Sequence, residues 1–221
     1  MKAKINSNTP IQMNKLLSGL YGITDPILMP SLEQMLTQVE SSLKGGVKIV
    51  QYRDKSSDQE KRFLEANALN QLCQKYSTPL LINDDVELAL KTGAAGVHLG
   101  QSDGSVAEAR ATLGNQAIIG VTCHDSLKLA IHAEKQGADY LAFGAFFPSQ
   151  TKPDAKPAPL QLLQEAKQKL SLPIVAIGGI SVDNANQIIN AGADMIAVIH
   201  ALYAQNDIKA TAQCFHQQFN K

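Results

Sequence analysis

Cysteine, net charge and long apolar runs are all scarce in this chain of 221 residues. The three cysteines are scattered and odd in number, which excludes a disulfide framework and a cysteine-based zinc site and fits a reducing compartment. Twenty lysines and arginines balance twenty acidic residues, so no net charge draws the chain towards nucleic acid or an anionic membrane. We therefore expect neither partner.

No apolar run approaches the ~20 residues that would span a bilayer. The polar start of the chain, residues 1–14, lacks the apolar core of a signal peptide, so we expect a cytoplasmic protein. Apolar residues make up 44% of the chain, which is enough for a globular core. The length suits a single domain over residues 1–221, with residues 1–16 as an N-terminal extension.

Eight short apolar runs recur along the chain, and such near-continuous runs are typical of strands buried on both faces of a parallel sheet. Helical patterns fill the gaps between them. One begins at a capping box that starts with Ser31, and another follows the box Ser57 to Glu60 and reaches about Tyr76. The expected strands are residues 20–24, 47–52, 79–82, 96–99, 118–122, 140–143, 174–177 and 195–199.

Eight strand–helix units of roughly 25 residues predict an α/β protein, a single (β/α)8 TIM barrel with eight parallel strands. Glycine-containing segments just before four of the strands mark where helices end. The alternative is a doubly wound open sheet. Such sheets often carry a Gly-x-Gly-x-x-Gly turn, which this sequence lacks.

The segment 148–159 holds four of the nine prolines and lies between the sixth predicted strand and its helix. A long polar loop in an otherwise tight barrel is usually a functional lid over the active site. A stiff surface connection is the other interpretation, and composition alone does not decide between them.

Polar side chains follow most of the predicted strands, and barrel active sites lie at the carboxyl ends of the strands. After the second strand, alternation of the extended chain puts Gln51, Arg53 and Lys55 on one side. Asp84 follows the third strand and Asp103 the fourth, and neither has an obvious helix-capping task. Two carboxylates beside arginine and lysine suit Mg²⁺ together with a diphosphate or triphosphate.

A second anion site is expected after the seventh strand, where Gly178 and Gly179 would let backbone N–H groups approach a phosphate. Two anion sites in one barrel mouth suggest two phosphorylated small-molecule substrates. Among the histidines, His98 lies inside a strand and is interpreted as a satisfied core residue, whereas His124 is a candidate general base. A lysine Schiff base would be a different reaction class, and the candidate lysines lack the apolar flanks that would depress their pKa.

Taken in order, seven motifs resemble those of the thiamine-phosphate synthase family. They cover the chain from about residue 20 to residue 202. The matching segments are Gln51-Tyr-Arg-Asp-Lys55, Leu81-Ile-Asn-Asp84, Gly96-Val-His-Leu-Gly-Gln-Ser-Asp103, Ile119-Gly-Val-Thr-Cys-His124, Phe147-Pro-Ser-Gln-Thr-Lys152, Val175-Ala-Ile-Gly-Gly-Ile180 and Ala193-Asp-Met-Ile-Ala-Val-Ile199.

The resemblance implies a transferase of thiamine biosynthesis. Such an enzyme joins 4-amino-2-methyl-5-hydroxymethylpyrimidine diphosphate to a thiazole phosphate or carboxyphosphate and releases diphosphate, with Mg²⁺ held by the aspartates matching Asp84 and Asp103. The pyrimidine diphosphate would be bound by residues matching Gln51, Arg53, Lys55, Asn83, Thr122 and Lys152, of which Arg53, Lys55, Thr122 and Lys152 are the expected catalytic residues. The thiazole phosphate would be bound by residues matching Ser149, Thr151, Gly178, Ile199 and His200, to which the glycine pair adds Gly179.

Two positions depart from the family pattern, because Thr122 and His200 stand where serine is usual. Two alternatives to the synthase are kept. One is a thiazole tautomerase-like barrel, which tends to carry a histidine at the position of His124 but lacks the diphosphate and Mg²⁺ residues. The other is a non-catalytic phosphate-binding barrel. The sequence leaves open whether the chain forms a homo-oligomer.

Overall fold

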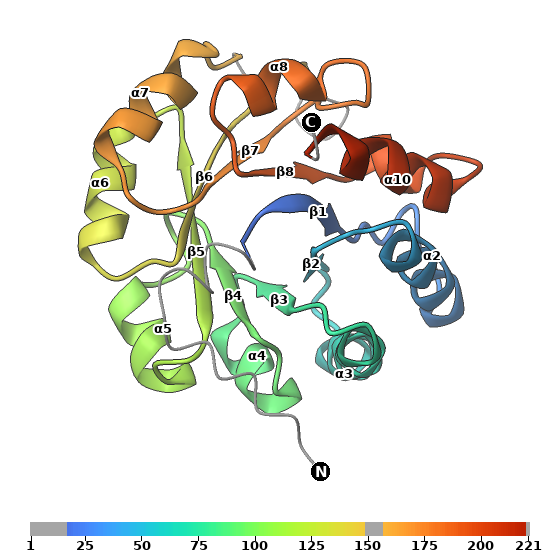
Figure 1. Ribbon diagram of the computed structural model, residues 1–221. Coiled ribbons are helices and arrows are strands. Elements are labelled where there is room, and N and C mark those ends of the chain that lie inside the picture. The colour runs from blue at the N-terminus through green and yellow to red at the C-terminus, as the bar shows by residue number, and fades with distance from the viewer. Residues whose placement is uncertain (1–16, 149–156, 220–221) are drawn as a thin grey trace.

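Eight parallel strands close into a ring in chain order, each bonded to the next, and β8 pairs back onto β1 (Figure 1). The computed structural model describes residues 17–148 and 157–219. The ring with helices around its outside confirms the predicted (β/α)8 barrel. That the whole chain forms one domain stays a prediction. The expected extension at residues 1–16 and most of the expected loop at 148–159 lie outside the described residues.

The apolar runs in the sequence correspond to the strands. β4 and β7 have the predicted bounds, whereas β5 continues two residues past the expected end, through a register shift between Thr122 and His124. Backbone pairing in β5 therefore extends beyond the apolar run from which the strand was predicted. The strands are β1 Gly19–Ile23, β2 Ile49–Tyr52, β3 Leu80–Asn83, β4 Gly96–Leu99, β5 Ile118–His124, β6 Tyr140–Gly144, β7 Ile174–Ile177 and β8 Met195–Val198.

The helices surround the ring, and most of those described begin at a serine or aspartate that caps the helix, whereas α7, α8 and α9 begin without a side-chain cap. The Ser31 hydroxyl accepts a hydrogen bond from the Gln34 N–H at 3.2 Å, as the sequence predicts. The expected start at Ser57 is wrong by one residue, because Asp58 is the cap and accepts from the Lys61 N–H at 2.9 Å. The helices are α2 Leu32–Lys44, α3 Gln59–Lys75, α4 Val86–Thr92, α5 Val106–Leu113, α6 Leu127–Lys135, α7 Gln161–Lys169, α8 Ala185–Asn190, α9 His200–Tyr203 and α10 Ile208–Gln218. No helix in the described ranges is long and apolar enough to cross a membrane.

Two separate apolar cores hold the barrel together. The larger one lies between the strands and the helices, and the smaller one fills the inside of the ring with side chains such as Leu17, Ile49, Leu81 and Met195. Burial of this kind stabilises the fold by about 25 cal/mol for each Å² of apolar surface removed from water. Leu17, Ile49 and Met195 stand at or before the first residue of their strands, so these side chains fill the amino end of the ring.

Candidate active site

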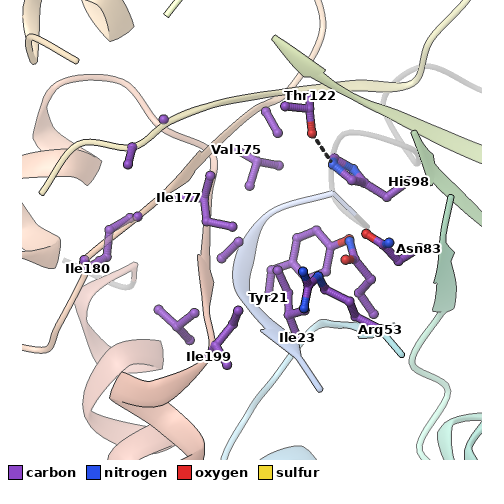
Figure 2. Close-up of a pocket in the computed structure, with 18 of the residues that line it drawn as sticks. Tyr21, Ile23, Arg53, Asn83, His98, Thr122, Val175, Ile177, Ile180 and Ile199 are labelled. Carbon is purple, nitrogen blue, oxygen red and sulfur yellow. Dashed lines mark hydrogen bonds between the residues drawn. The ribbon is translucent and has the colours of Figure 1, made fainter. Parts of the chain in front are cut away.

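A cavity of about 960 Å³ opens at the carboxyl ends of the strands. Figure 2 shows apolar side chains of β7 and of the segments that follow β7 and β8 on one side of it, and polar side chains that lie on or directly after β2 to β5 on the other. Eleven of the predicted site residues line this cavity: Gln51, Arg53, Lys55, Asn83, Asp84, Asp103, Thr122, Gly178, Gly179, Ile199 and His200. The remaining three, Ser149, Thr151 and Lys152, lie outside the described residues.

The end of β2 is held so that alternate side chains enter the cavity. Tyr52 faces away from it, and its hydroxyl donates to the buried Glu65 carboxylate at 2.8 Å. Asp54 also faces away and pairs with the Lys61 ammonium at 2.5 Å. These contacts to α3 fix the strand end, and the predicted alternation is confirmed because the cavity is lined by Gln51, Arg53 and Lys55.

Asp84 combines an unusual backbone with a crowded carboxylate. Its φ of 62° lies in the left-handed region, which non-glycine residues adopt rarely and often at functional sites. Its carboxylate accepts hydrogen bonds from the Asn83 amide at 2.7 Å and from the Lys55 ammonium. Burial raises the pKa of the Asp84 carboxyl, the nearby Asp103 carboxyl raises it further, and Lys55 opposes both.

Asp103 is held by its own loop, since its carboxylate accepts the Gly100 N–H at 2.9 Å. Asp85, one residue after Asp84, serves another purpose. It caps α4 by accepting the Leu88 N–H at 2.8 Å and pairs with the Arg62 guanidinium at 2.9 Å. The structure therefore separates the two acids that line the cavity from the neighbouring acid that caps the start of α4.

The Asp84–Asp103 pair fits Mg²⁺ better than a metal that needs a closed protein site. Within the described ranges, no group of three or more histidine, cysteine, aspartate or glutamate residues could hold a metal. Mg²⁺ takes oxygen ligands, typically one or two carboxylates, and completes its shell with water and substrate phosphates. Burial and the nearby Asp103 carboxyl raise the pKa of Asp84, and a bound cation would oppose both by favouring the charged carboxylates.

The floor of the cavity is a hydrogen-bonded group of side chains. His98 contacts the Thr122 hydroxyl through Nε2 and the Tyr140 hydroxyl through Nδ1, both at 2.8 Å (Figure 2 shows the former contact). The Tyr21 hydroxyl lies 3.0 Å from that of Tyr140 and accepts from the Gln51 amide at 2.6 Å. Burial lowers the pKa of His98 to about 4, so the ring is neutral near pH 7. Both ring nitrogens have partners, as expected of a satisfied histidine, but the side chain lines the cavity and is not simply part of the core.

Tyr21 and Tyr140 were not predicted as part of the site. The available signal was that both are tyrosines in strands whose other residues are mostly aliphatic or small, at positions that turn out to face the inside of the ring. Gly120 of β5 makes room for one of them, because a Cβ there would lie 1.9 Å from the Tyr140 ring.

The turn after β7 is built on its two glycines. Gly178 has a φ of 102° and Gly179 a φ of 62°. Their carbonyls accept from the Phe147 N–H and the Asn184 amide, both at 3.0 Å, which fixes the turn against the end of β6 and the start of α8. After β8, Ile199 precedes α9, which begins at His200.

Known proteins resemble this chain over nearly its whole length. The family model for thiamine monophosphate synthase matches residues 20–202. The thiamine-phosphate synthase of Marinobacter nauticus is 53% identical over 208 residues, which is 93% of each chain. That of Thioalkalivibrio sulfidiphilus is 51% identical over 197 residues, covering 89% of this chain and 93% of the relative.

A solved structure agrees with the sequence relatives. The thiamine phosphate pyrophosphorylase of Pyrococcus furiosus superposes with a TM-score of 0.84 at 34% identity, covering 94% of this chain and 98% of that one. Fold, motifs and relatives thus agree, and the resemblance predicted from the seven motifs is confirmed. The chain belongs to the thiamine monophosphate synthase family.

Proposed function

We propose that this enzyme couples a hydroxymethylpyrimidine diphosphate to a thiazole phosphate, giving thiamine phosphate and diphosphate. One observation carries the proposal. A single cavity is lined by the Asp84–Asp103 pair with its neighbouring cations and also by the Gly178–Gly179 turn. These two groups come from β2 to β4 and from β7, which lie on opposite sides of an eight-stranded ring. Two anionic substrates can therefore enter one cavity and meet between the two sites.

Each anion site has its own residues. Asp84 and Asp103 would hold Mg²⁺, which when bound neutralises charge on the diphosphate. The guanidinium of Arg53 can bind two diphosphate oxygens at once, and the Lys55 ammonium adds a point charge. Gln51, Asn83 and Thr122 orient the pyrimidine diphosphate, and the resemblance adds Lys152. On the other side, the thiazole phosphate binds to Gly178, Gly179, Ile199 and His200, and the resemblance adds Ser149 and Thr151.

The reaction needs stabilisation of a leaving group more than it needs a base. The bond between the methylene carbon and the diphosphate oxygen breaks, and its electron pair leaves with the diphosphate. The carbocation that remains is stabilised by the aminopyrimidine, and the lone pair of the thiazole nitrogen captures it. Fixed cations near the departing oxygens stabilise the charge where it develops, which is usually the largest contribution in such sites.

The test mixes the protein with both phosphorylated substrates, with and without Mg²⁺, and assays thiamine phosphate and diphosphate together. We expect equal amounts of the two products, formed only with Mg²⁺. Isomerisation of a thiazole without diphosphate release would instead identify a tautomerase. Binding of the substrates without any product would identify a phosphate-binding barrel.

His200→Ser should retain activity, with the KM for thiazole phosphate changed by less than about tenfold, or roughly 1.4 kcal/mol. The reason is that the phosphate site rests chiefly on backbone N–H groups, which are independent of the side chain at this position. The measurement is the ratio of the two KM values, variant to wild type, at several pH values, because the ionisation of the substrate is common to both. A ratio that is large at pH 6 and collapses by pH 8 would contradict the prediction and assign the phosphate contact to the imidazolium.

A further inference from the structure

Five side chains form a continuous hydrogen-bonded chain beneath the cavity, from Gln51 through Tyr21, Tyr140 and His98 to Thr122. They come from five strands, β2, β1, β6, β4 and β5, so the chain crosses the inside of the barrel. Its two ends line the cavity, whereas Tyr140 is fully buried. In each of these hydrogen bonds one atom donates and the other accepts. Because each tyrosine hydroxyl has only one proton, the donor in one bond determines the donor in the next.

The Gln51 amide determines in which direction the protons are donated along the whole series of hydrogen bonds. Gln51 contacts Tyr21 through its nitrogen, which can only donate, so the Tyr21 oxygen accepts there. The proton of Tyr21 then goes to the Tyr140 oxygen, and that of Tyr140 goes to Nδ1 of His98. A neutral imidazole has one donor and one acceptor nitrogen, so the ring proton is on Nε2 and is donated to the Thr122 hydroxyl oxygen.

The opposite direction leaves a buried proton without a partner. If Thr122 donated to His98, the bonds from Thr122 as far as Tyr21 would reverse, whereas the Gln51 amide would still donate, so the Tyr21 oxygen would accept from both Gln51 and Tyr140. Its own proton would then have no acceptor among the described residues. Tyr21 is buried, with 1% of its surface exposed, and a buried hydroxyl proton without an acceptor is costly.

We propose that Tyr140 and His98 are positioning residues that direct the hydroxyl proton of Thr122 into the cavity, where it is donated to a diphosphate oxygen of the pyrimidine substrate. The identity of that acceptor rests on the proposed function, whereas the direction of the chain does not. The diphosphate oxygens are the acceptors that gain charge as the bond to carbon breaks, so this bond strengthens in the transition state. The extra methyl of Thr122 compared with serine restricts its side-chain rotation, which keeps the hydroxyl towards His98.

The direction of proton donation, from Gln51 to Thr122, is tested on the ligand-free protein by ¹⁵N NMR of the His98 ring. We expect Nε2 to carry the ring proton and Nδ1 to be unprotonated. Gln51→Glu replaces the donor at the start of the chain with an acceptor, so every bond should reverse and the proton should move to Nδ1. A wild-type ring protonated on Nδ1, or a Gln51→Glu variant that keeps the proton on Nε2, overturns the proposal.

The effect on the reaction is tested by Tyr140→Phe against a matched control, Tyr203→Phe. Both remove a buried tyrosine hydroxyl, but that of Tyr203 bonds to Ser42 at 3.1 Å and belongs to the core between strands and helices. We expect Tyr140→Phe to lower kcat about tenfold with KM changed by less than about twofold, and Tyr203→Phe to keep kcat near the wild-type value.

Equal losses of kcat in the two variants, or an unchanged kcat in Tyr140→Phe, would overturn the catalytic part of the proposal. If the wild-type protein forms no thiamine phosphate while His98 carries its proton on Nε2, the proposed function fails and the direction of the chain stands. The two failures are therefore distinguishable, because the NMR measurement needs no substrate and no turnover.

Discussion

Asp84→Asn and Asp103→Asn should each lower kcat at limiting Mg²⁺ by at least about a hundredfold. Each substitution removes one of the two charges proposed to hold Mg²⁺ on the diphosphate, and among the described residues no group of three or more acids, histidines or cysteines could hold a metal. Excess Mg²⁺ should restore part of the activity, because the metal site is weakened and not abolished. Steady-state rates over a Mg²⁺ titration make the measurement.

Asp85→Asn is the matched control for this pair. It makes the same change of charge one residue away, and asparagine caps a helix as well as aspartate does. Its carboxylate faces Leu88 and Arg62 and does not line the large cavity, so kcat and its Mg²⁺ dependence should stay near wild type. Near wild-type rates in Asp84→Asn and Asp103→Asn at limiting Mg²⁺ would refute the metal assignment.

Stability provides a second readout for Asp84→Asn. Burial and then the Asp103 carboxyl raise the pKa of Asp84, so the folded chain holds this proton to a higher pH than the unfolded chain does. The contribution of Asp84 to the free energy of unfolding therefore falls as pH rises from the ordinary aspartate value through the raised one. Asparagine carries no charge to repel, so in the absence of Mg²⁺ the variant should melt at the same temperature as the wild type or higher, at pH values above that window.

Gly179→Ala should lower both stability and affinity for the thiazole phosphate. At a φ of 62° an alanine is strained, and its Cβ would lie 2.3 Å from the carbonyl oxygen of Pro148 and 2.7 Å from Phe147. Strain and overpacking together should cost about 2–5 kcal/mol of unfolding free energy. The turn must shift to relieve the clash, so the KM for thiazole phosphate should rise at least about tenfold.

Gly93→Ala separates the two causes. Gly93 has nearly the same φ, 63°, but a Cβ there meets nothing within 4 Å. This control should cost only the backbone strain, about 1–2 kcal/mol, and leave the KM unchanged. Thermal unfolding and steady-state kinetics of both variants make the comparison. Equal destabilisation by the two substitutions, with equal KM values, would show that the turn after β7 tolerates a side chain and is not the phosphate site.

Much of the site follows from two rules that need no structure. Barrel active sites lie at the carboxyl ends of strands, and side chains alternate along an extended chain. Together these rules predict that Gln51, Arg53 and Lys55 share one cavity with Asp84 and Asp103, as they do in the structure. The eight strands were predictable for a similar reason, because burial on both faces leaves a continuous apolar run in the sequence.

The hydrogen-bonded floor was not predictable in this way. Tyr21 and Tyr140 are 119 residues apart, and their hydroxyls meet only because β1 and β6 face each other across the inside of the ring. A run that contains tyrosine is also compatible with an ordinary core strand. The predicted start of α3 was wrong for a more local reason. Ser57 and Asp58 can both cap a helix, and only the tertiary contacts of the segment decide between them.

The pairing of β1 with β8 has a consequence for how the chain folds. The seam joins Gly19 to Met195, so one edge of the first strand stays unpaired until nearly the whole chain has left the ribosome. Contacts of such long separation form slowly, and an open strand edge is a template for association with other chains. Closure of the seam, with α10 packed against α2 over it, removes both edges of the sheet at once. Substitutions that weaken the pairing of β1 with β8 should therefore reduce the yield of folded protein more than they reduce the turnover of the molecules that do fold.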